Sequence, residues 1–268
     1  MRTVLTIAGS DSGGGAGIQA DIKAISANGA FGMSVITAVT AQNTQEVRSV
    51  QHIDLDIIQD QLEAVFDDIP VDAVKIGMLG NVETVHVVAK ALLKYKPKCI
   101  VVDPVMISKG GHSLLEQSAV EALKKEILPL SSIITPNIPE AEVLIGRSLQ
   151  TEEEMYKACE EIMQTGVEAV LIKGGHLMGS PNDLFYNGED FHWLKAERIQ
   201  TKNTHGTGCT LSSAIAANLA KGMTLLEAVT LAKQYITTAI THSLSLGSGH
   251  GPTHHFYDLY KHSKMVVK

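Results

Sequence analysis

The sequence has few cysteines, few aromatic residues and no long apolar run. Its three cysteines, Cys99, Cys159 and Cys209, lie far apart in the 268 residues and form no Cys-x-x-Cys pair, which favours reduced thiols over a disulfide framework. Aromatic residues make up only 4% of the chain, which argues against an aromatic ligand cage. The opening apolar run, Val4–Ala8, is too short for a secretory signal, and no run approaches the ~18 residues of a membrane span. We therefore expect a soluble, cytoplasmic protein with no membrane contact.

Basic charge is also scarce, and several catalytic signatures are missing. The formal net charge is −7 and no basic run occurs, so the electrostatics do not support nucleic-acid binding. The chain contains no Gly-x-x-x-x-Gly-Lys-Ser/Thr, which excludes a P-loop of that type. It also contains neither His-Glu-x-x-His nor Gly-x-Ser-x-Gly, which removes the usual zinc protease and hydrolase templates.

Apolar runs rich in β-branched residues alternate with amphipathic segments along most of the chain. These runs are continuously apolar, as strands are when both faces of a parallel sheet are covered. We expect strands at Val4–Ala8, Val35–Thr40, Ala73–Met78, Cys99–Asp103, Ile133–Thr135 and Ala169–Lys173, and helices at about 15–28, 54–66, 82–95, 116–127 and 152–165. Thr151-x-x-Glu154 and Thr224-x-x-Glu227 have the pattern of capping boxes, the second opening a helix that extends toward Ser243.

The segment Asp183–Ile199 departs from this alternation. Apolar and aromatic residues flank Asn187-Gly188 there, a dipeptide typical of a tight turn between antiparallel strands. No linker or internal repeat divides the chain. The sequence therefore predicts one α/β domain, residues 1–268, with three layers: helices cover both faces of a mostly parallel sheet, which carries an antiparallel hairpin.

A glycine-rich loop, Gly9–Gly17, follows the first strand. It is similar to a dinucleotide-binding loop, but the second strand leads into Ala41-Gln42-Asn43 instead of an acidic residue for a ribose. The Gln42 amide can donate and accept hydrogen bonds at once, which suits a heterocycle with a ring nitrogen beside an amino group. Asp21, in the helix that follows, is a second candidate for this pocket. The alternative is that the glycine run is only a tight turn, that Asp21 lies on the surface of a helix and that Gln42 lies in a loop.

Four polar residues stand at later strand ends, where ligands bind in open parallel sheets. Asp103 closes a buried apolar strand, and a carboxylate there is costly unless it faces a ligand, a metal or a partner. Asn137 and Glu140 lie three residues apart at a helix start and offer the oxygen ligands that Mg²⁺ prefers. Lys173 precedes two glycines and can reach a polyphosphate as a mobile charge. The alternatives are that Lys173 is a solvated lysine before a turn, and that Glu140 is simply an acidic residue favoured in a first helical turn.

The stretch Thr204–Thr210 reads Thr-His-Gly-Thr-Gly-Cys-Thr and precedes a helix rich in small residues. Its glycines let the backbone approach a ligand closely, and the N–H groups of a helix start favour an anion. Cys209 falls in the first turn, where we expect the same field to lower its pKa toward the thiolate. A helix start with a small buried cysteine is the alternative.

In this order the motifs resemble those of the ribokinase-fold small-molecule kinases, and within them the hydroxymethylpyrimidine/phosphomethylpyrimidine kinases of thiamin biosynthesis. The resemblance covers essentially the whole chain. It rests on the stretches Leu5–Asp21, Thr40–Thr44, Lys75–Met78, Asp103–Met106, Thr135–Ala141, Ile172–His176 and Thr204–Thr210. It implies a ribokinase-like fold and Mg²⁺-dependent transfer of phosphate from ATP to the pyrimidine hydroxymethyl group. A second transfer to that monophosphate is implied as well, and often a homodimer.

The resemblance also implies roles for individual residues. Cys209 would take the proton of the substrate hydroxyl, while Lys173 and the loop residues Gly206, Thr207 and Gly208 would bind the developing charge. The pyrimidine would contact Gly9, Asp21, Gln42, Met78 and Val105. ATP would contact Asp103, Asn137, Lys173, Thr204, Gly206, Gly208 and Lys233, with Gly249–Pro252 near its adenine, and Mg²⁺ would be held near Asp103 and Glu140.

Three alternatives remain. A pyridoxal or pyridoxine kinase of the same fold would carry a further cysteine in the flap, just before a Lys-Gly pair; here Ser108 stands in that place, so efficient pyridoxal phosphorylation is not expected. The flap, at about 107–114, is a candidate lid over the site.

The second alternative, a nucleotide-binding oxidoreductase, would use the Gly9–Gly17 loop. A non-catalytic vitamin-binding protein should lack Cys209, Lys173 or Asp103, and all three are present.

Overall fold

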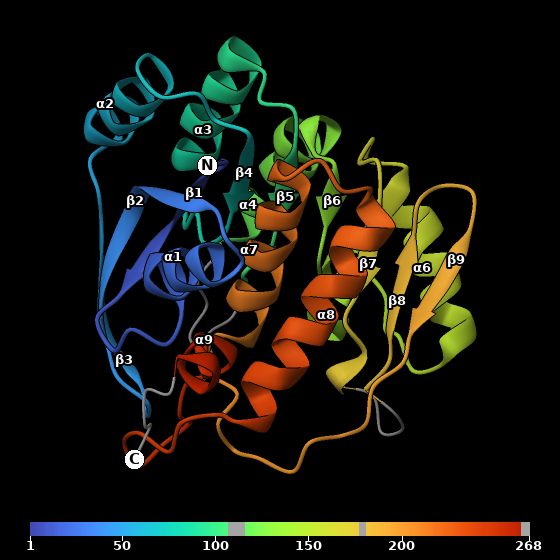
Figure 1. Ribbon diagram of the computed structural model, residues 1–268. Coiled ribbons are helices and arrows are strands. Elements are labelled where there is room, and N and C mark those ends of the chain that lie inside the picture. Colours follow the sequence, from blue (N-terminus) through green and yellow to red (C-terminus); the bar gives the residue numbers. More distant parts are fainter. Residues whose placement is uncertain (107–115, 177–180, 264–268) are drawn as a thin grey trace.

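The computed structural model describes residues 1–106, 116–176 and 181–263. Within these residues one nine-stranded sheet forms the centre of the molecule, in the order β3-β2-β1-β4-β5-β6-β7-β8-β9 (Figure 1). The strands are β1 (Thr3–Asp11), β2 (Phe31–Gln42), β3 (Val47–His52), β4 (Ala73–Ile76), β5 (Ile100–Val102), β6 (Ile133–Ile134), β7 (Val170–Ile172), β8 (Asp183–Tyr186) and β9 (Phe191–Leu194). Neighbouring strands from β2 to β7 pair in parallel, as the continuous apolar runs predicted.

Antiparallel strands close both ends of the sheet. At one end β8 and β9 form the hairpin expected around Asn187-Gly188, where Gly188 has a φ of 90°. At the other end β3 pairs antiparallel with β2. The sequence did not predict β3, because its side chains from Arg48 to His52 are all exposed and so carry no apolar alternation.

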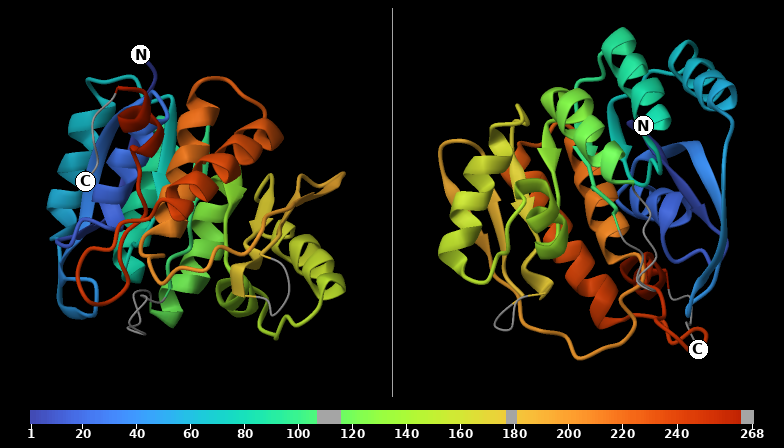
Figure 2. Two further views of the ribbon diagram at one scale, coloured as in Figure 1. Left: turned by 60° about the horizontal axis from the view of Figure 1, so that its bottom comes forward. Right: turned by 180° about the vertical axis from the view of Figure 1, so that it is seen from behind.

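Helices cover both faces of the sheet. They are α1 (Gly17–Ala27), α2 (Leu55–Phe66), α3 (Val82–Tyr95), α4 (Gln117–Ala122), α5 (Ile138–Ile145), α6 (Glu152–Met163), α7 (Thr207–Ala220), α8 (Leu225–Thr241) and α9 (Tyr257–His262). Helices α1, α7 and α8 lie over one face, and α2, α3 and α6 lie over the other, as the view from behind in Figure 2 shows. The three-layer α/β/α arrangement predicted from the sequence is therefore confirmed.

Two apolar clusters, one on each side of the sheet, explain the continuous apolar strands. Leu5 and Val102 belong to a cluster that includes residues of α2, α3 and α6, whereas their neighbours Val4 and Val101 belong to a cluster with residues of α1, α7 and α8. Because successive strand residues point to opposite faces, every position of such a strand is buried. The burial of both faces stabilises the sheet mainly through the hydrophobic effect.

The helix boundaries agree closely with the local signals. Both predicted capping boxes form, Thr151 with Glu154 and Thr224 with Glu227. The helix predicted over about 116–127 is less regular: after α4 the chain continues as a π-helical turn, Leu123–Ile127, and then a 3-10 turn that contains Pro129. Among the described residues, no helix is long and apolar enough to cross a membrane.

Candidate active site

A cavity of about 500 Å³ opens at the carboxyl ends of the parallel strands. It lies where the strand order reverses beside β1, since β2 follows on one side and β4 on the other. Ligands bind at such positions in open α/β sheets. The walls come from the β1–α1 loop, the ends of β2, β5 and β7, and the first turns of α5 and α7. Of the described site residues expected from the sequence, all line this cavity except Asp21 and the Gly249–Pro252 stretch.

The loop before α7 is held in one backbone conformation. Gly206 is the N-cap residue with a φ of 76°, and a Cβ atom there would overlap the carbonyl oxygen of Gly15. Both facts require glycine at this position. The hydroxyl of Thr207 donates to the carbonyl of Thr204 at 2.8 Å. Since residues 206–209 all line the cavity, the backbone N–H groups of this first helical turn form a candidate anion-binding site.

Lys173 joins two carboxylates beside this turn. Its Nζ lies 2.8 Å from Asp103 Oδ1 and 3.9 Å from Glu140 Oε2. Burial works to lower the pKa of Lys173, but the charges of Asp103 and Glu140 outweigh it and raise the pKa above its ordinary value. Burial raises the pKa of Glu140 to about 7, although the charge of Lys173 opposes this. The three groups, from β7, β5 and α5, meet at one edge of the sheet as the sequence predicted.

Asn137 and Glu140 open α5 with a reciprocal capping box. The Asn137 side chain accepts from the Glu140 N–H at 2.9 Å, and Glu140 Oε2 accepts from the Asn137 N–H at 2.8 Å. Both residues therefore act as capping residues of α5, as the alternative interpretation expected. Both also line the cavity. The hard oxygen atoms of Asp103 and Glu140 fit Mg²⁺, which keeps several waters and substrate phosphates in its coordination shell. Within the part of the chain that the structure describes, no group of three or more His, Cys, Asp or Glu side chains could hold a metal ion by itself.

The structure corrects the expectation that Cys209 is readily ionised. Burial raises the pKa of its thiol to about 12, and the charges of Asp21 and Asp103 add to this effect, while the ammonium of Lys75 opposes it. Desolvation of the thiolate thus outweighs the favourable field of the helix start and of Lys75. Cys209 lines the cavity, and its surroundings there favour the neutral thiol over the thiolate.

Four of the residues predicted from the sequence to contact the pyrimidine line the cavity. They are Gly9, Gln42, Met78 and Val105. A Cβ atom on Gly9 would come within 2.7 Å of Met78 Cε, so no side chain fits there without moving Met78. The hydroxyl of Ser12 fixes the backbone of Gln42, because it accepts from the Gln42 N–H at 2.8 Å and donates to the Gln42 carbonyl at 2.7 Å.

Asp21 lies behind the cavity wall instead of in it. It is 0% exposed, and it accepts hydrogen bonds from Thr6 Oγ1 at 2.6 Å, Lys75 Nζ at 2.9 Å and Ser213 Oγ at 2.8 Å. Its oxygens are therefore already paired within the protein, and direct contact with the substrate is not what this geometry offers. Lys75, which the sequence analysis did not single out, lines the cavity in its place. The sequence does carry a signal for Lys75, because a lysine in the middle of the apolar strand β4 must have a buried partner or face a site.

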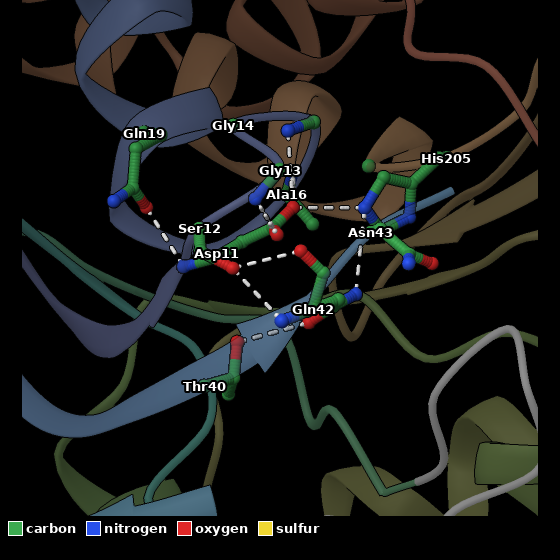
Figure 3. Close-up of polar contacts among 12 residues, drawn as sticks. Asp11, Ser12, Gly13, Gly14, Ala16, Gln19, Thr40, Gln42, Asn43 and His205 are labelled. Atoms are coloured by element: carbon green, nitrogen blue, oxygen red, sulfur yellow. Dashed lines mark hydrogen bonds and ion pairs between the residues drawn. The ribbon is translucent and has the colours of Figure 1, made fainter. Parts of the chain in front are cut away.

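Asp11 and His205 were also missed as a pair. Asp11 is 2% exposed, and its Oδ2 lies 2.8 Å from His205 Nε2 (Figure 3). The same carboxylate accepts the N–H groups of Gly13, Gly15 and Ala16 at 2.8, 3.0 and 2.8 Å. An acidic residue inside a glycine run was the available signal, since glycines let the backbone fold around a carboxylate.

The far end of the cavity holds Lys233, whose Nζ lies 2.6 Å from Asp183 Oδ2. The Gly249–Pro252 stretch, expected near the adenine, does not line the cavity. It packs instead on the β2–β3 turn, where the His250 N–H donates to the Thr44 carbonyl at 2.8 Å, and on Asn203, whose side chain accepts from the Gly251 N–H at 3.1 Å. Ser108 and the expected flap lie outside the described residues.

Comparisons with known proteins agree with this geometry. A family model described as phosphomethylpyrimidine kinase matches residues 11–254. The hydroxymethylpyrimidine/phosphomethylpyrimidine kinase of Rhizobium meliloti is 52% identical over 96% of this chain and 98% of that protein. The thiamine biosynthesis bifunctional protein of Geobacter sulfurreducens is 51% identical over 94% of this chain, which spans about half (52%) of that longer protein.

A solved structure confirms the ribokinase-like fold. The ADP complex of Bacillus subtilis pyridoxal kinase superimposes with a TM-score of 0.90 at 41% identity, covering 96% of this chain and 98% of that one. Its identity is lower than that of the pyrimidine kinase from Rhizobium meliloti, which favours the pyrimidine branch predicted from the sequence. From the family model, the relatives and the site together, this chain belongs to the phosphomethylpyrimidine kinase family.

Proposed function

We propose that the protein transfers phosphate from ATP to the hydroxymethyl group of 4-amino-5-hydroxymethyl-2-methylpyrimidine, and then to the resulting monophosphate, in thiamin biosynthesis. One observation supports this most directly. A Cβ atom on Gly208 would lie 3.2 Å from both Lys173 Nζ and Asp103 Oδ2. The cation, the carboxylate and the backbone amides of α7 therefore converge on one point, where a transferring phosphoryl group would be bound.

Phosphoryl transfer requires in-line positioning and neutralisation of charge more than covalent catalysis. The first-turn amides of α7 would bind the charge that develops on the phosphoryl oxygens, and one strong donor of this kind is worth ~3–4 kcal/mol. Lys173 would neutralise further phosphate charge. Asp103 and Glu140 would hold Mg²⁺, which when bound supplies additional positive charge at the phosphates.

Cys209 is the proposed acceptor of the hydroxyl proton. As the substrate oxygen forms its bond to the γ-phosphorus, the bond from that phosphorus to the β–γ bridging oxygen breaks, and the electron pair leaves with ADP. The hydroxyl proton passes to the Cys209 sulfur, which must be a thiolate at that moment. Lys75 is the nearby cation that favours the thiolate, so its charge would support this step.

A pyridoxal kinase is the second candidate, because the superimposed Bacillus subtilis enzyme is one. A coupled ATP-consumption assay separates the two functions when the pyrimidine alcohol, its monophosphate and pyridoxal are compared. We expect turnover of both pyrimidines with kcat/KM well above that for pyridoxal. Preferred turnover of pyridoxal would overturn the assignment.

We further propose that residues 1–268 form one domain, that the protein works in the cytoplasm and that it is a homodimer. The continuous sheet from β3 to β9 supports a single domain. Light scattering of the purified protein tests the dimer, and a monomeric mass would contradict it.

A further inference from the structure

The side-chain amide of Gln42 lies between two polar groups of the protein (Figure 3). Thr40 Oγ1 is 3.2 Å from the atom placed as its oxygen, and His205 Nε2 is 3.4 Å from the atom placed as its nitrogen. The oxygen and nitrogen of an amide have nearly the same shape, so only the surrounding hydrogen bonds determine which way it is turned. Its two neighbours therefore decide which donor and which acceptor Gln42 offers to a ligand.

The first neighbour, His205, is fixed by Asp11. Burial works to raise the pKa of Asp11, but its hydrogen bonds from His205 and Ala16 outweigh burial and hold that pKa below its ordinary value. An ionised carboxylate only accepts hydrogen bonds. The 2.8 Å contact to Asp11 therefore requires a proton on His205 Nε2, whether the ring is neutral or charged. If the NH₂ group of Gln42 faced this nitrogen, two hydrogen-bond donors would point at each other with no acceptor between them.

The second neighbour, Thr40, has a single hydroxyl proton. The hydroxyl lies 2.9 Å from the carbonyl oxygen of Ser10, and because that oxygen can only accept, the Thr40 proton points to it. Thr40 Oγ1 therefore presents only lone pairs to Gln42. Like His205, it matches an amide turned by 180°, with the oxygen toward His205 and the NH₂ group toward Thr40.

We propose that Asp11, His205 and Thr40 turn the Gln42 amide in this direction and thereby set its specificity. One N–H of Gln42 is then used on Thr40, and one lone pair of its oxygen faces the His205 N–H, which is donated mainly to Asp11. The other N–H and the other lone pair remain for the ligand. When the exocyclic group of the heterocycle faces the Gln42 oxygen, on the His205 side, this edge matches a ring-nitrogen acceptor beside an amino donor. In the same placement it rejects an edge in which a ring N–H lies beside a keto oxygen.

This inference rests on the proposed function for the identity of the ligand, but not for the direction of the amide. Asp11, His205 and Thr40 act on the substrate through Gln42, so they are positioning residues. Ser12 holds the backbone of Gln42 in place, and the direction of the amide is what the other three residues add.

The protonated nitrogen of His205 can be observed without any substrate. ¹⁵N NMR of the protein labelled in its histidines reports which ring nitrogens carry protons, and the spectrum of His205→Gln assigns the missing signal. We expect His205 Nε2 to be protonated at neutral pH. An unprotonated Nε2 would overturn the proposal, whatever the protein phosphorylates.

The specificity is tested with the 4-amino pyrimidine and its 4-oxo analogue in Thr40→Val, with Thr40→Ser as the matched control that keeps the hydroxyl. The wild type should prefer the amino compound by about 100-fold or more in kcat/KM, since a site built for one hydrogen-bonding edge leaves polar groups unpaired with the other. Thr40→Val should reduce this preference about tenfold and raise KM for the pyrimidine while KM for ATP stays unchanged. Thr40→Ser should keep the preference.

Gln42→Ala shows how much preference for the amino compound remains without the amide. We expect this variant to lose most of the preference. An unchanged preference in Thr40→Val, or an equal loss in Thr40→Ser, would contradict the proposal. If the wild type phosphorylated neither pyrimidine, the proposed function would fail, and the NMR experiment would still decide the direction of the amide.

Discussion

The ammonium of Lys75 and the carboxylate of Asp21 form an ion pair, 2.9 Å from Nζ to Oδ2, in which neither side chain is exposed to solvent. Asp21 also binds Thr6 and Ser213, so one carboxylate connects β1, β4, α1 and α7. Ser213 stands one helical turn after Cys209, on the same side of α7. The ion pair therefore helps to hold α7, which carries Cys209, against the sheet.

Removing one partner of this pair should be costly. Asp21→Ala leaves the Lys75 ammonium buried without its carboxylate, and we expect the free energy of unfolding to fall by about 3–5 kcal/mol. Urea denaturation followed by circular dichroism measures this change. Glu46→Ala, which breaks the exposed pair with Arg48, is the matched control and should cost less than about 1 kcal/mol. A similar cost for both variants would contradict the account.

The high pKa of Cys209 predicts a pH-dependent rate. If the thiolate takes the substrate proton, its population rises tenfold with each pH unit below its pKa of about 12, so kcat should rise with pH. The range above pH 8 is diagnostic, because Glu140, with a pKa of about 7, is already ionised there. Cys209→Ala should lower kcat by roughly 10²–10⁴, the usual contribution of a positioned base, and should remove this rise. A flat profile, or near-normal turnover of the variant, would remove Cys209 from the proton transfer.

A methyl group on Gly208 should block the reaction without unfolding the protein. In Gly208→Ala the new Cβ atom would lie 3.2 Å from Lys173 Nζ and Asp103 Oδ2, in the space assigned to the phosphoryl group. Because small misplacements of reacting groups cost about 10²-fold, we expect kcat to fall by about that factor. Thermal unfolding of the same variant is the control and should be nearly unchanged. Wild-type kcat would show that the phosphoryl group is bound elsewhere.

Buried His255 should make stability depend on pH. Burial lowers the pKa of His255 from 6.5 to about 3, and its Nε2 lies 3.0 Å from the Thr210 hydroxyl, which donates to Gly206. The unfolded chain therefore binds one more proton between pH 6.5 and 3. The stabilisation is fully present above pH 6.5 and is lost as pH falls toward 3, with a slope of up to about 1.4 kcal/mol per pH unit.

His255→Gln tests this assignment, because glutamine can still donate to Thr210 but does not titrate. In urea unfolding at pH 7, 5.5 and 4.5, the stability of the wild type should fall more steeply than that of the variant. Two parallel curves would mean that another group causes the acid sensitivity.

Features that depend on local sequence were predictable. The apolar strands follow from burial on both faces, as in Val101 and Val102, and the capping boxes of α6 and α8 follow from residues three apart. The Asn187-Gly188 turn is equally local. The residues at the strand ends, among them Asp103 and Lys173, converge because parallel strands place their carboxyl ends at one edge.

Features that depend on distant partners were not predictable. Lys75 pairs with a residue 54 positions away, and His205 pairs with Asp11 across 194 positions, so neither pair has a local pattern. Asp21 looked like a ligand contact because the sequence does not show that Thr6, Lys75 and Ser213 occupy it. The pKa of Cys209 depends on burial, which the helix-start motif does not reveal.

The central claim, two successive phosphoryl transfers to one hydroxymethylpyrimidine, is tested most directly by ³¹P NMR of the protein with the pyrimidine alcohol, ATP and Mg²⁺. We predict that a phosphate monoester signal appears first and then gives way to the paired signals of a pyrimidine diphosphate, with one ADP formed for each transfer. ADP formation without a phosphorylated pyrimidine, or a product that stops at the monoester with ATP still in excess, would contradict the account.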